Sequence, residues 1–367
     1  MTHRLTPLAE SLPASVPFVG PEAQERSRGA PFAARLGANE SVFGPSPRAI
    51  EAMEAAARDA WMYGDPEGHD LKQALAAHHG IPMTSIVLGE GIDGLLGYLV
   101  RLLVGPGDAV VTSAGAYPTF NYHVSGFGGT IHTVPFAGNH EDPEALIARA
   151  AEVDAKLIYL ANPDNPMGSH HDASTVQGML DALPDGCLLC LDEAYADLAP
   201  PEAIPPIDPA DPRLIRMRTF SKAHGLAGLR VGYAIGHPDL IRAFDKVRNH
   251  FGVGRLSQAA ALAALGDQDW LANVQAQVAQ SRDAIAQIAI AHGLTPLPSA
   301  TNFVTVDCGR DGAHARRVLA GLIARGVFVR MPGVAPLDRC IRISCGTRAD
   351  LTALSEALPA ALKDAET

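Results

Sequence analysis

The chain has 367 residues, a formal net charge of −11 at neutral pH and 47% hydrophobic residues. This length allows two or three domains and a large hydrophobic core. The acidic balance, without any run of Lys and Arg, argues against a nucleic-acid-binding surface, because contacts to phosphate backbones need clustered cations. No segment reaches the ~18 consecutive apolar residues of a membrane span, and the N-terminus has no basic-then-apolar signal pattern, so we expect a cytoplasmic protein without membrane partners.

The five cysteines do not predict a disulfide framework, because their number is odd and the chain is large. Cys187 and Cys190 have a C-x-x-C spacing, but they lie in an apolar run and no second pair follows. Packed thiols are therefore favoured over a redox or zinc site. The pair His78-His79 ends an amphipathic helix and the pair His170-His171 follows a loop, so no metal is assigned.

Short apolar runs alternate with helical periods along most of the chain. Runs with strand character cover residues 86–88, 109–112, 131–134 and 157–160. This alternation is typical of α/β proteins. Because crossovers between parallel strands are right-handed, we expect a mainly parallel sheet.

The loop of residues 89–94 precedes an apolar helix over residues 95–104. The free N–H groups at the start of such a helix can bind a phosphate. We therefore expect the backbones of Gly91 and Ile92 to contact one, although a simple strand-to-helix turn explains the same residues.

Polar side chains follow two further strands. The strand of residues 156–161 runs into the breaker-rich turn of residues 162–168, which contains Asn165, and residues 188–191 run into Asp192 and Tyr195. Ligands of open α/β sheets collect at the carboxyl edge of the strands, so these three side chains should meet there. An Asp at a strand end is also common as a turn or helix cap.

Lys222 follows the strand expected over residues 214–220 and has two hydroxyls, Thr219 and Ser221, and the guanidinium of Arg230 nearby. A protein could hold a phosphate dianion beside an amine in this way. The combination suggests a lysine that reacts with the aldehyde of pyridoxal phosphate. Asp192 would then keep the pyridine nitrogen protonated, and Tyr195 and Asn165 would hydrogen-bond the ring's phenolic oxygen.

Together these motifs resemble a fold-type I pyridoxal-phosphate enzyme of the class I/II aminotransferases, and most closely the histidinol-phosphate aminotransferase branch. The resemblance runs from residues 36–40 and 44–47, through residues 162–168, 192–195 and 221–230, to residues 299–303 and 342–347. It implies an α/β fold in which a large domain, with a mainly parallel sheet flanked by helices, is joined to a smaller α+β domain. The large domain would span residues 36–255, and residues 1–35 and 256–367 would form the small one. One long helix from residue 256 to about residue 292 would join them.

The resemblance also assigns roles to individual residues. It makes Lys222, Asp192 and Tyr195 catalytic, and the freed lysine amine would act as general base for the substrate's α-proton. The expected cofactor contacts are Lys222, Asp192, Tyr195, Asn165, Thr219, Ser221, Arg230, Gly91 and Ile92, with Phe120 stacked on the ring and Tyr63 reaching the phosphate of a neighbouring subunit. A homodimer follows from the role of Tyr63. Core packing for Phe120 and a surface position for Tyr63 are the alternatives.

Arg342 lies in a strand, where a buried guanidinium needs an anionic partner. The resemblance supplies the carboxylate of an amino or keto acid, or the phosphate of histidinol phosphate. Arg330 would share this substrate pocket, or lie at an exposed edge. Asn39 would lie there too, in a segment that reads Asn39-Glu40-Ser41-Val42 where histidinol-phosphate relatives commonly have Asn-Glu-Asn-Pro.

The expected function is amino transfer between an amino acid or amino-phosphate donor and a 2-keto acid. A decarboxylase of the threonine-phosphate type or a lyase would use the same scaffold, because a fold does not select the bond that breaks. A ligand-responsive regulator would need a DNA-binding module. The first ~35 residues have neither the length of a helix-turn-helix motif nor a basic face.

Overall fold

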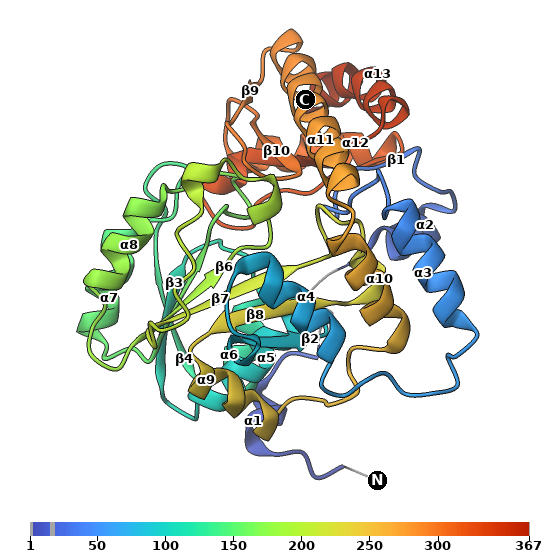
Figure 1. Ribbon diagram of the computed structural model, residues 1–367. Coiled ribbons are helices and arrows are strands. Elements are labelled where there is room, and N and C mark those ends of the chain that lie inside the picture. Colours follow the sequence, from blue (N-terminus) through green and yellow to red (C-terminus); the bar gives the residue numbers. More distant parts are fainter. Residues whose placement is uncertain (1–2, 15–18, 367) are drawn as a thin grey trace.

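The computed structural model describes residues 3–14 and 19–366 (Figure 1). Its centre is a seven-stranded sheet with the order β2-β8-β7-β6-β5-β3-β4. The strands are β2 (Ile86–Gly89), β3 (Ala109–Ser113), β4 (Thr130–Val134), β5 (Leu157–Ala161), β6 (Leu188–Asp192), β7 (Leu214–Thr219) and β8 (Gly232–Gly236). The predicted mainly parallel sheet is confirmed, since only the pairs made by β8 are antiparallel.

Strand β8 runs against its neighbours because no crossover helix precedes it. Between β7 and β8 the chain forms only a loop with one short 3-10 turn, η4 (Ala227–Leu229). A parallel neighbour would need a longer connection, usually through a helix. The chain therefore reverses directly, and the loop that carries Lys222 stays at the carboxyl edge of the sheet.

Strands β5 and β6 are apolar up to Asp192 because helices cover both faces of the sheet. Strand β7 is the exception, since it buries Arg216 and Arg218, which are both paired with the carboxylate of Glu193. Alternate residues of β5 and β6 pack against α5 (Gly91–Leu103) and α6 (Thr119–Gly126) on one face. The residues between them pack against α7 (Pro143–Glu152) and α8 (Ala173–Asp181) on the other. The other helices of this part are α3 (Pro47–Ala57), α4 (His69–His79), α9 (Pro238–Ala243) and α10 (Arg255–Leu265).

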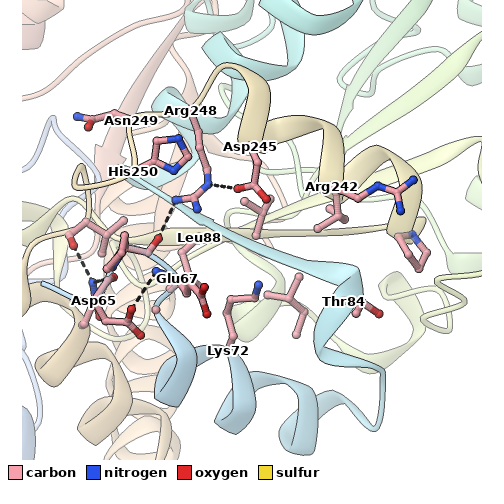
Figure 2. A pocket seen from close by; sticks show the side chains of 18 residues that line it. Asp65, Glu67, Lys72, Thr84, Leu88, Arg242, Asp245, Arg248, Asn249 and His250 are labelled. Atoms are coloured by element: carbon pink, nitrogen blue, oxygen red, sulfur yellow. Dashed lines mark hydrogen bonds and ion pairs between the residues drawn. The ribbon is translucent and has the colours of Figure 1, made fainter.

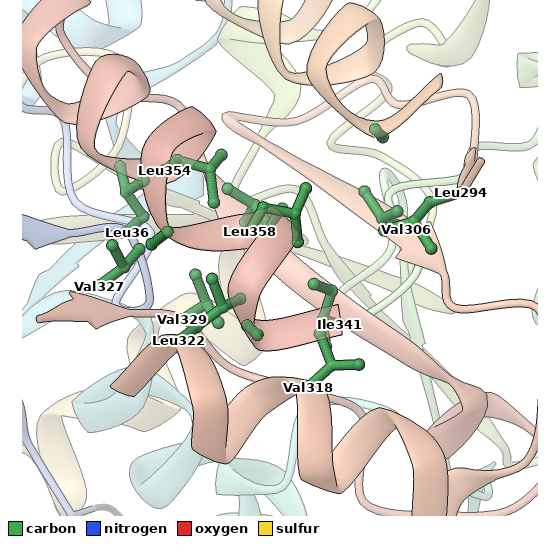
Figure 3. Close-up of a cluster of buried hydrophobic side chains, with 14 of the residues drawn as sticks. Leu36, Leu294, Val306, Val318, Leu322, Val327, Val329, Ile341, Leu354 and Leu358 are labelled. Carbon is green, nitrogen blue, oxygen red and sulfur yellow. The ribbon is translucent and has the colours of Figure 1, made fainter. Parts of the chain in front are cut away.

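The C-terminal part forms a second, smaller layer, at the top of Figure 1. Its antiparallel sheet has the order β12-β10-β9, from β9 (Thr295–Pro296), β10 (Phe303–Asp307) and β12 (Cys340–Ser344). The helices α11 (Gln268–Ala291), α12 (Gly312–Ala324) and α13 (Arg348–Ala365) pack with it. Their buried side chains form one core, which includes Val306, Val318, Ile341, Leu354 and Leu358 (Figure 3).

Only the later part of the N-terminal segment joins this smaller layer. Helix α1 (Pro7–Ser11) lies at the bottom of Figure 1, at the opposite end of the molecule. After α2 (Pro21–Arg28), strand β1 (Ala34–Arg35) pairs in parallel with β11 (Val327–Phe328). Leu36 is fully buried in the C-terminal core. The predicted assignment of residues 1–35 to the small domain, and the boundaries as a whole, stay a prediction.

The single helix expected from residue 256 to about residue 292 is wrong. The structure has two helices, α10 and α11, which are separated at Gly266 and Asp267. The side chain of Asp267 accepts a hydrogen bond of 3.4 Å from the backbone N–H of Trp270 and caps α11. Because α10 packs on α3 and α4 while α11 packs on β9 and β10, the break lets one alanine-rich segment serve both layers.

Within residues 3–14 and 19–366, no helix is both long and apolar enough to span a membrane.

Candidate active site

A cavity of about 740 Å³ lies where the carboxyl ends of β5, β6 and β7 meet the smaller layer. It has walls from both parts of the chain. Its lining includes most of the residues singled out in the sequence: Asn39, Ile92, Asn165, Asp192, Tyr195, Thr219, Ser221, Lys222, Arg230, Arg330 and Arg342. The predicted meeting of these side chains at one sheet edge is therefore found in the structure.

Lys222 follows β7 directly, and its Nζ donates a 3.1 Å hydrogen bond to the backbone oxygen of Asn39. Burial lowers the pKa of Lys222 to about 8, with the cations of Arg342 and Arg230 acting in the same direction. The carboxylates of Glu40 and Asp192 oppose this shift. A lysine with this pKa is partly neutral near physiological pH, which is the form that attacks a carbonyl or takes a proton.

Asp192 ends β6 and is only 5% exposed. Its carboxylate accepts 2.6 Å and 3.0 Å hydrogen bonds from the Tyr159 hydroxyl and the Ala194 backbone. Burial nevertheless raises the pKa of Asp192 to about 6. A cationic ring nitrogen next to the carboxylate would offset the cost of burying the negative charge. Asp192 therefore suits its predicted role as the partner of a pyridine nitrogen.

Tyr195 is the meeting point of a hydrogen-bonded chain. Its hydroxyl oxygen accepts from Asn39 Nδ2 at 3.1 Å and from Asn165 Nδ2 at 3.4 Å. Asn165 Oδ1 in turn accepts from Nη1 of Arg342. Because the Tyr195 oxygen already accepts twice, its own proton is left to donate to a ligand.

Arg230, Ser221 and Thr219 form a cradle beside the start of α5. Arg230 Nη1 donates to Ser221 Oγ at 3.3 Å, and Thr219 Oγ1 donates to the same oxygen at 2.9 Å. Arg230 has a left-handed backbone with φ of 49°. A Cβ at Gly91 would lie 2.4 Å from the Arg230 guanidinium, so only glycine allows this approach. A guanidinium, two hydroxyls and a helix N-terminus fit a phosphate dianion.

Arg342 extends the cavity into the smaller layer. Nη2 of Arg342 donates 3.1 Å to the backbone oxygen of Gly37, but its buried Nε–H has no partner among the described residues. Burial lowers the pKa of Arg342, and the neighbouring Arg330 adds to this effect. Arg330 donates 2.6 Å from Nη2 to the backbone oxygen of Val19. Two partly desolvated guanidinium groups in one cavity favour an anionic ligand.

Comparison with known proteins places this geometry in a family. The model of aminotransferase class I and II matches residues 34–358. Histidinol-phosphate aminotransferase 1 of Nitrosococcus oceani is 36% identical over 350 residues, which are 94% of this chain and 92% of the relative. Histidinol-phosphate aminotransferase 2 of Ralstonia nicotianae is 37% identical over 90% of this chain and 89% of its own length.

The chain is a class I and II aminotransferase.

Solved structures agree with this assignment. The crystal structure of histidinol-phosphate aminotransferase from Sinorhizobium meliloti, in complex with pyridoxal-5'-phosphate, is 55% identical with a TM-score of 0.96, and the match covers 99% of this chain and 98% of that chain. An aspartate aminotransferase from Thermus thermophilus has a TM-score of 0.83 at 21% identity, over 99% of this chain and all of that chain, and shares the fold. The family resemblance and fold type I predicted from the sequence are thus confirmed.

Three predicted cofactor residues of this aminotransferase, Gly91, Phe120 and Tyr63, are not among the residues that line the cavity. Phe120 is fully buried and stacks on Tyr159, with ring centroids 4.8 Å apart and an angle of 12°. Phe120 thus supports the wall from behind, while Tyr117, three residues earlier, lines the cavity. Tyr63 is 78% exposed, and its ring centroid lies 4.7 Å from that of Phe251, which does not line the cavity either.

Sequence reasoning missed several residues of the aminotransferase site. Tyr159, which donates to Asp192, is hidden in an apolar strand, and only its alternation with Leu160 indicates which face it occupies. Glu141 carries no recognisable motif, but it is buried and accepts hydrogen bonds from Ser113 Oγ at 2.6 Å and the Ala161 N–H at 3.0 Å. It therefore links the carboxyl ends of β3 and β5. Burial raises the pKa of Glu141 to about 7.

A second cavity, of about 640 Å³, shares no lining residue with the first (Figure 2). Arg248 lies in it with its charge already engaged, because Nε donates 2.6 Å to Asp245 and Nη1 donates 2.9 Å to the Pro66 oxygen. Lys72 also faces it, and burial lowers its pKa. The lining carries three acidic and three basic side chains, Asp65, Glu67, Asp245, Lys72, Arg242 and Arg248, so no charge excess selects a ligand.

Proposed function

We propose that this aminotransferase binds pyridoxal phosphate at Lys222 and moves an amino group from histidinol phosphate, or a close amino-phosphate relative, to a 2-keto acid. The observation that carries the proposal is the single cavity that holds Lys222, Asp192 and the Arg230 cradle together. The curated relatives named above support the donor, and the pyridoxal-5'-phosphate complex from Sinorhizobium meliloti supports the cofactor.

The residues present fit this cofactor. Arg230, Thr219, Ser221 and the N-terminus of α5 would hold its phosphate. Asp192 would face the ring nitrogen, and Asn165 and Tyr195 would donate to the ring oxygen. When bound, pyridoxal phosphate withdraws electrons from the substrate carbon that carries the amine.

The side chains of this protein would supply the remaining chemistry. The Lys222 amine, whose pKa is lowered to about 8, would act as the general base that takes the proton from the amine-bearing carbon of the substrate, and its protonated form would be the acid that gives the proton back. The hydrogen-bonded chain of Asn39, Tyr195 and Asn165 keeps the Tyr195 proton directed to the ligand. Arg342, with its unpartnered Nε–H, binds the phosphate of the donor or a carboxylate of the keto acid.

We further propose that the active unit is a homodimer in which Tyr63 of each subunit completes the phosphate site of the other. Exposed aromatic side chains gather near Tyr63, namely Trp61 at 81% exposure and Phe251 at 50%. Large exposed aromatic groups of this kind are typical of interfaces. A cytoplasmic location, expected from the sequence, stays a prediction.

Borohydride reduction of the purified protein with pyridoxal phosphate, followed by peptide mapping, tests the covalent link. The label is expected on Lys222, and the Lys222→Ala variant should lose transamination. Incubation with histidinol phosphate and 2-oxoglutarate should then yield a keto product and glutamate. Release of carbon dioxide from amino-acid donors would instead support the decarboxylase alternative. A label on another lysine would contradict the proposed site.

A further inference from the structure

The wall of the active-site cavity carries charges of both signs. Arg330 and Arg342 supply cations, and Glu40 supplies a carboxylate. Among the ion pairs of residues 3–14 and 19–366, none joins Glu40 to either arginine. The cavity is therefore suited to a ligand that has both an anionic group and a group of positive or hydrogen-donating character.

The backbone of Glu40 is fixed beside the reacting amine. Lys222 Nζ donates 3.1 Å to the oxygen of Asn39, the preceding residue. Asn302 Nδ2 donates to the backbone oxygens of Asn39 at 3.0 Å and of Glu40 at 3.3 Å. The left-handed backbone of Asn39, with φ of 54°, turns the chain at this point. The backbone of Glu40 is thus held one residue away from the carbonyl group that binds the Lys222 amine.

The side chain of Glu40, in contrast, is exposed within the cavity. No hydrogen bond or ion pair to its carboxylate is found in the described part of the chain, although its negative charge acts on Lys222. A carboxylate that is anchored by its backbone and free at its oxygens is available for a ligand. A ligand group that donates a proton would satisfy it, whereas an apolar group would desolvate it without compensation.

We propose that Glu40 determines substrate specificity by accepting a hydrogen bond from the imidazole ring of an imidazole-bearing amino-phosphate, while Arg342 and Arg330 hold its phosphate. This inference rests on the proposed function and identifies the Glu40 carboxylate as the group that recognises the imidazole ring. In histidinol phosphate the carbon that carries the amine lies between the phosphate arm and the imidazole arm. With the amine at Lys222 and the phosphate at the arginines, the exposed carboxylate of Glu40 in the same cavity is available to the remaining arm.

The test compares two substrates that differ only in the ring. Phenylalaninol phosphate keeps the amine and the phosphate of histidinol phosphate but has no ring N–H. The ratio of kcat/KM for histidinol phosphate over phenylalaninol phosphate is measured for the holoenzyme and for Glu40→Gln. We expect this ratio to fall about tenfold in the variant, because the loss of a charge-assisted hydrogen bond weakens only the ring that can donate one. Glu54→Gln, exposed on α3 and absent from the cavity lining, is the matched control and should leave the ratio unchanged.

Calorimetric binding of histidinol phosphate to the pyridoxamine form of the holoenzyme separates recognition from chemistry. The dissociation constant should rise about tenfold in Glu40→Gln and not in Glu54→Gln. An unchanged substrate ratio would overturn the inference. If the ratio is unchanged because kcat/KM falls equally for both substrates, Glu40 acts on Lys222 rather than on the ring. If the unmodified enzyme accepts neither compound, the proposed donor is wrong and the inference is overturned with it.

Discussion

The surroundings of Lys222 set the pKa of its amine, so the rate at which this amine reacts with an aldehyde should increase with pH. Burial and the cations Arg342 and Arg230 lower the pKa of the amine to about 8. Only the neutral amine adds to an aldehyde. The rate at which the cofactor-free protein binds pyridoxal phosphate should therefore rise with pH, reach half its maximum near pH 8 and level off above it. Stopped-flow absorbance between pH 6 and pH 10 measures this rate.

The contribution of Arg342 to this pKa can be isolated by substitution. Arg342→Leu removes a neighbouring cation and should move the midpoint to higher pH, whereas Arg342→Lys keeps a charge there and should move it less. A midpoint that stays in place in both variants would show that Arg342 does not contribute, and would leave burial and Arg230 as the causes of the lowered pKa.

Asp192 links the protonation of the site to the stability of the fold. The pKa of its carboxyl is raised to about 6 in the folded protein from about 4 in an unfolded chain. The folded state thus binds the proton more tightly than the unfolded chain does. Protonation of Asp192 therefore stabilises the fold fully below about pH 4, and this stabilisation is lost as the pH rises through about 6. Asp192→Asn removes this dependence, and the cofactor-free variant should be more stable than the parent at pH 7 by at most about 3 kcal/mol.

Thermal unfolding of the two cofactor-free proteins at pH 4 and at pH 7 checks this prediction. The difference in Tm should be small at pH 4 and favour the variant at pH 7. With pyridoxal phosphate bound, the order should reverse, because the ring nitrogen then pairs with the carboxylate. A variant less stable than the parent at pH 7 without cofactor would contradict the argument.

At the scale of elements, the start of α5 has a position, Gly91, at which both the backbone conformation and the close approach of Arg230 require glycine. Gly91 has φ of 74°, and a Cβ there would meet the Arg230 guanidinium at 2.4 Å. Gly91→Ala should strain the backbone and displace Arg230, so the affinity for pyridoxal phosphate should fall at least about tenfold, since one charge-assisted contact contributes about 1.5–3 kcal/mol. Fluorescence titration with the cofactor measures the loss.

Gly107→Ala is the matched control, because Gly107 has φ of 86° but open space around its Cβ position. Both variants should lose about 1 kcal/mol of stability from backbone strain. Only Gly91→Ala should lose cofactor affinity. Equal losses of affinity would assign the effect to strain rather than to the cradle.

The strands and loops that form the edge of the sheet could be predicted, because apolar runs and the polar, turn-forming residues that follow them are visible in the sequence. Strands β5 and β6 are continuous apolar runs up to Asp192, which ends β6, and Asn165 and Lys222 lie in the loops that follow β5 and β7. The rest depended on tertiary contacts. The break between α10 and α11 was hidden because alanine continues on both sides of Gly266, and the stacking of Phe120 on Tyr159 has no signal in the sequence. Glu40 had no local signal, since its environment is built by Lys222 and Asn302, far along the chain.

At the scale of the whole molecule, the proposed dimer would explain the exposed position of Tyr63. Its ring lies on Phe251 with 78% of the residue exposed, although the family resemblance assigns it to a phosphate site. If a second subunit receives the hydroxyl, Tyr63→Phe should keep the dimer, because the ring still packs, but weaken the binding of pyridoxal phosphate about tenfold, as one charge-assisted hydrogen bond is lost.

Analytical ultracentrifugation and cofactor titration of the same samples test both parts of this prediction. Tyr122→Phe is the control, since Tyr122 is likewise exposed, at 60%, and does not line the cavity. Dilution should also release cofactor from the unmodified protein at the concentration where the dimer dissociates, because each site would lose a ligand supplied by the other subunit. A monomer that keeps full cofactor affinity, or a Tyr63→Phe dimer with unchanged affinity, would show that each chain builds its phosphate site alone, from Arg230, Ser221, Thr219 and the N-terminus of α5.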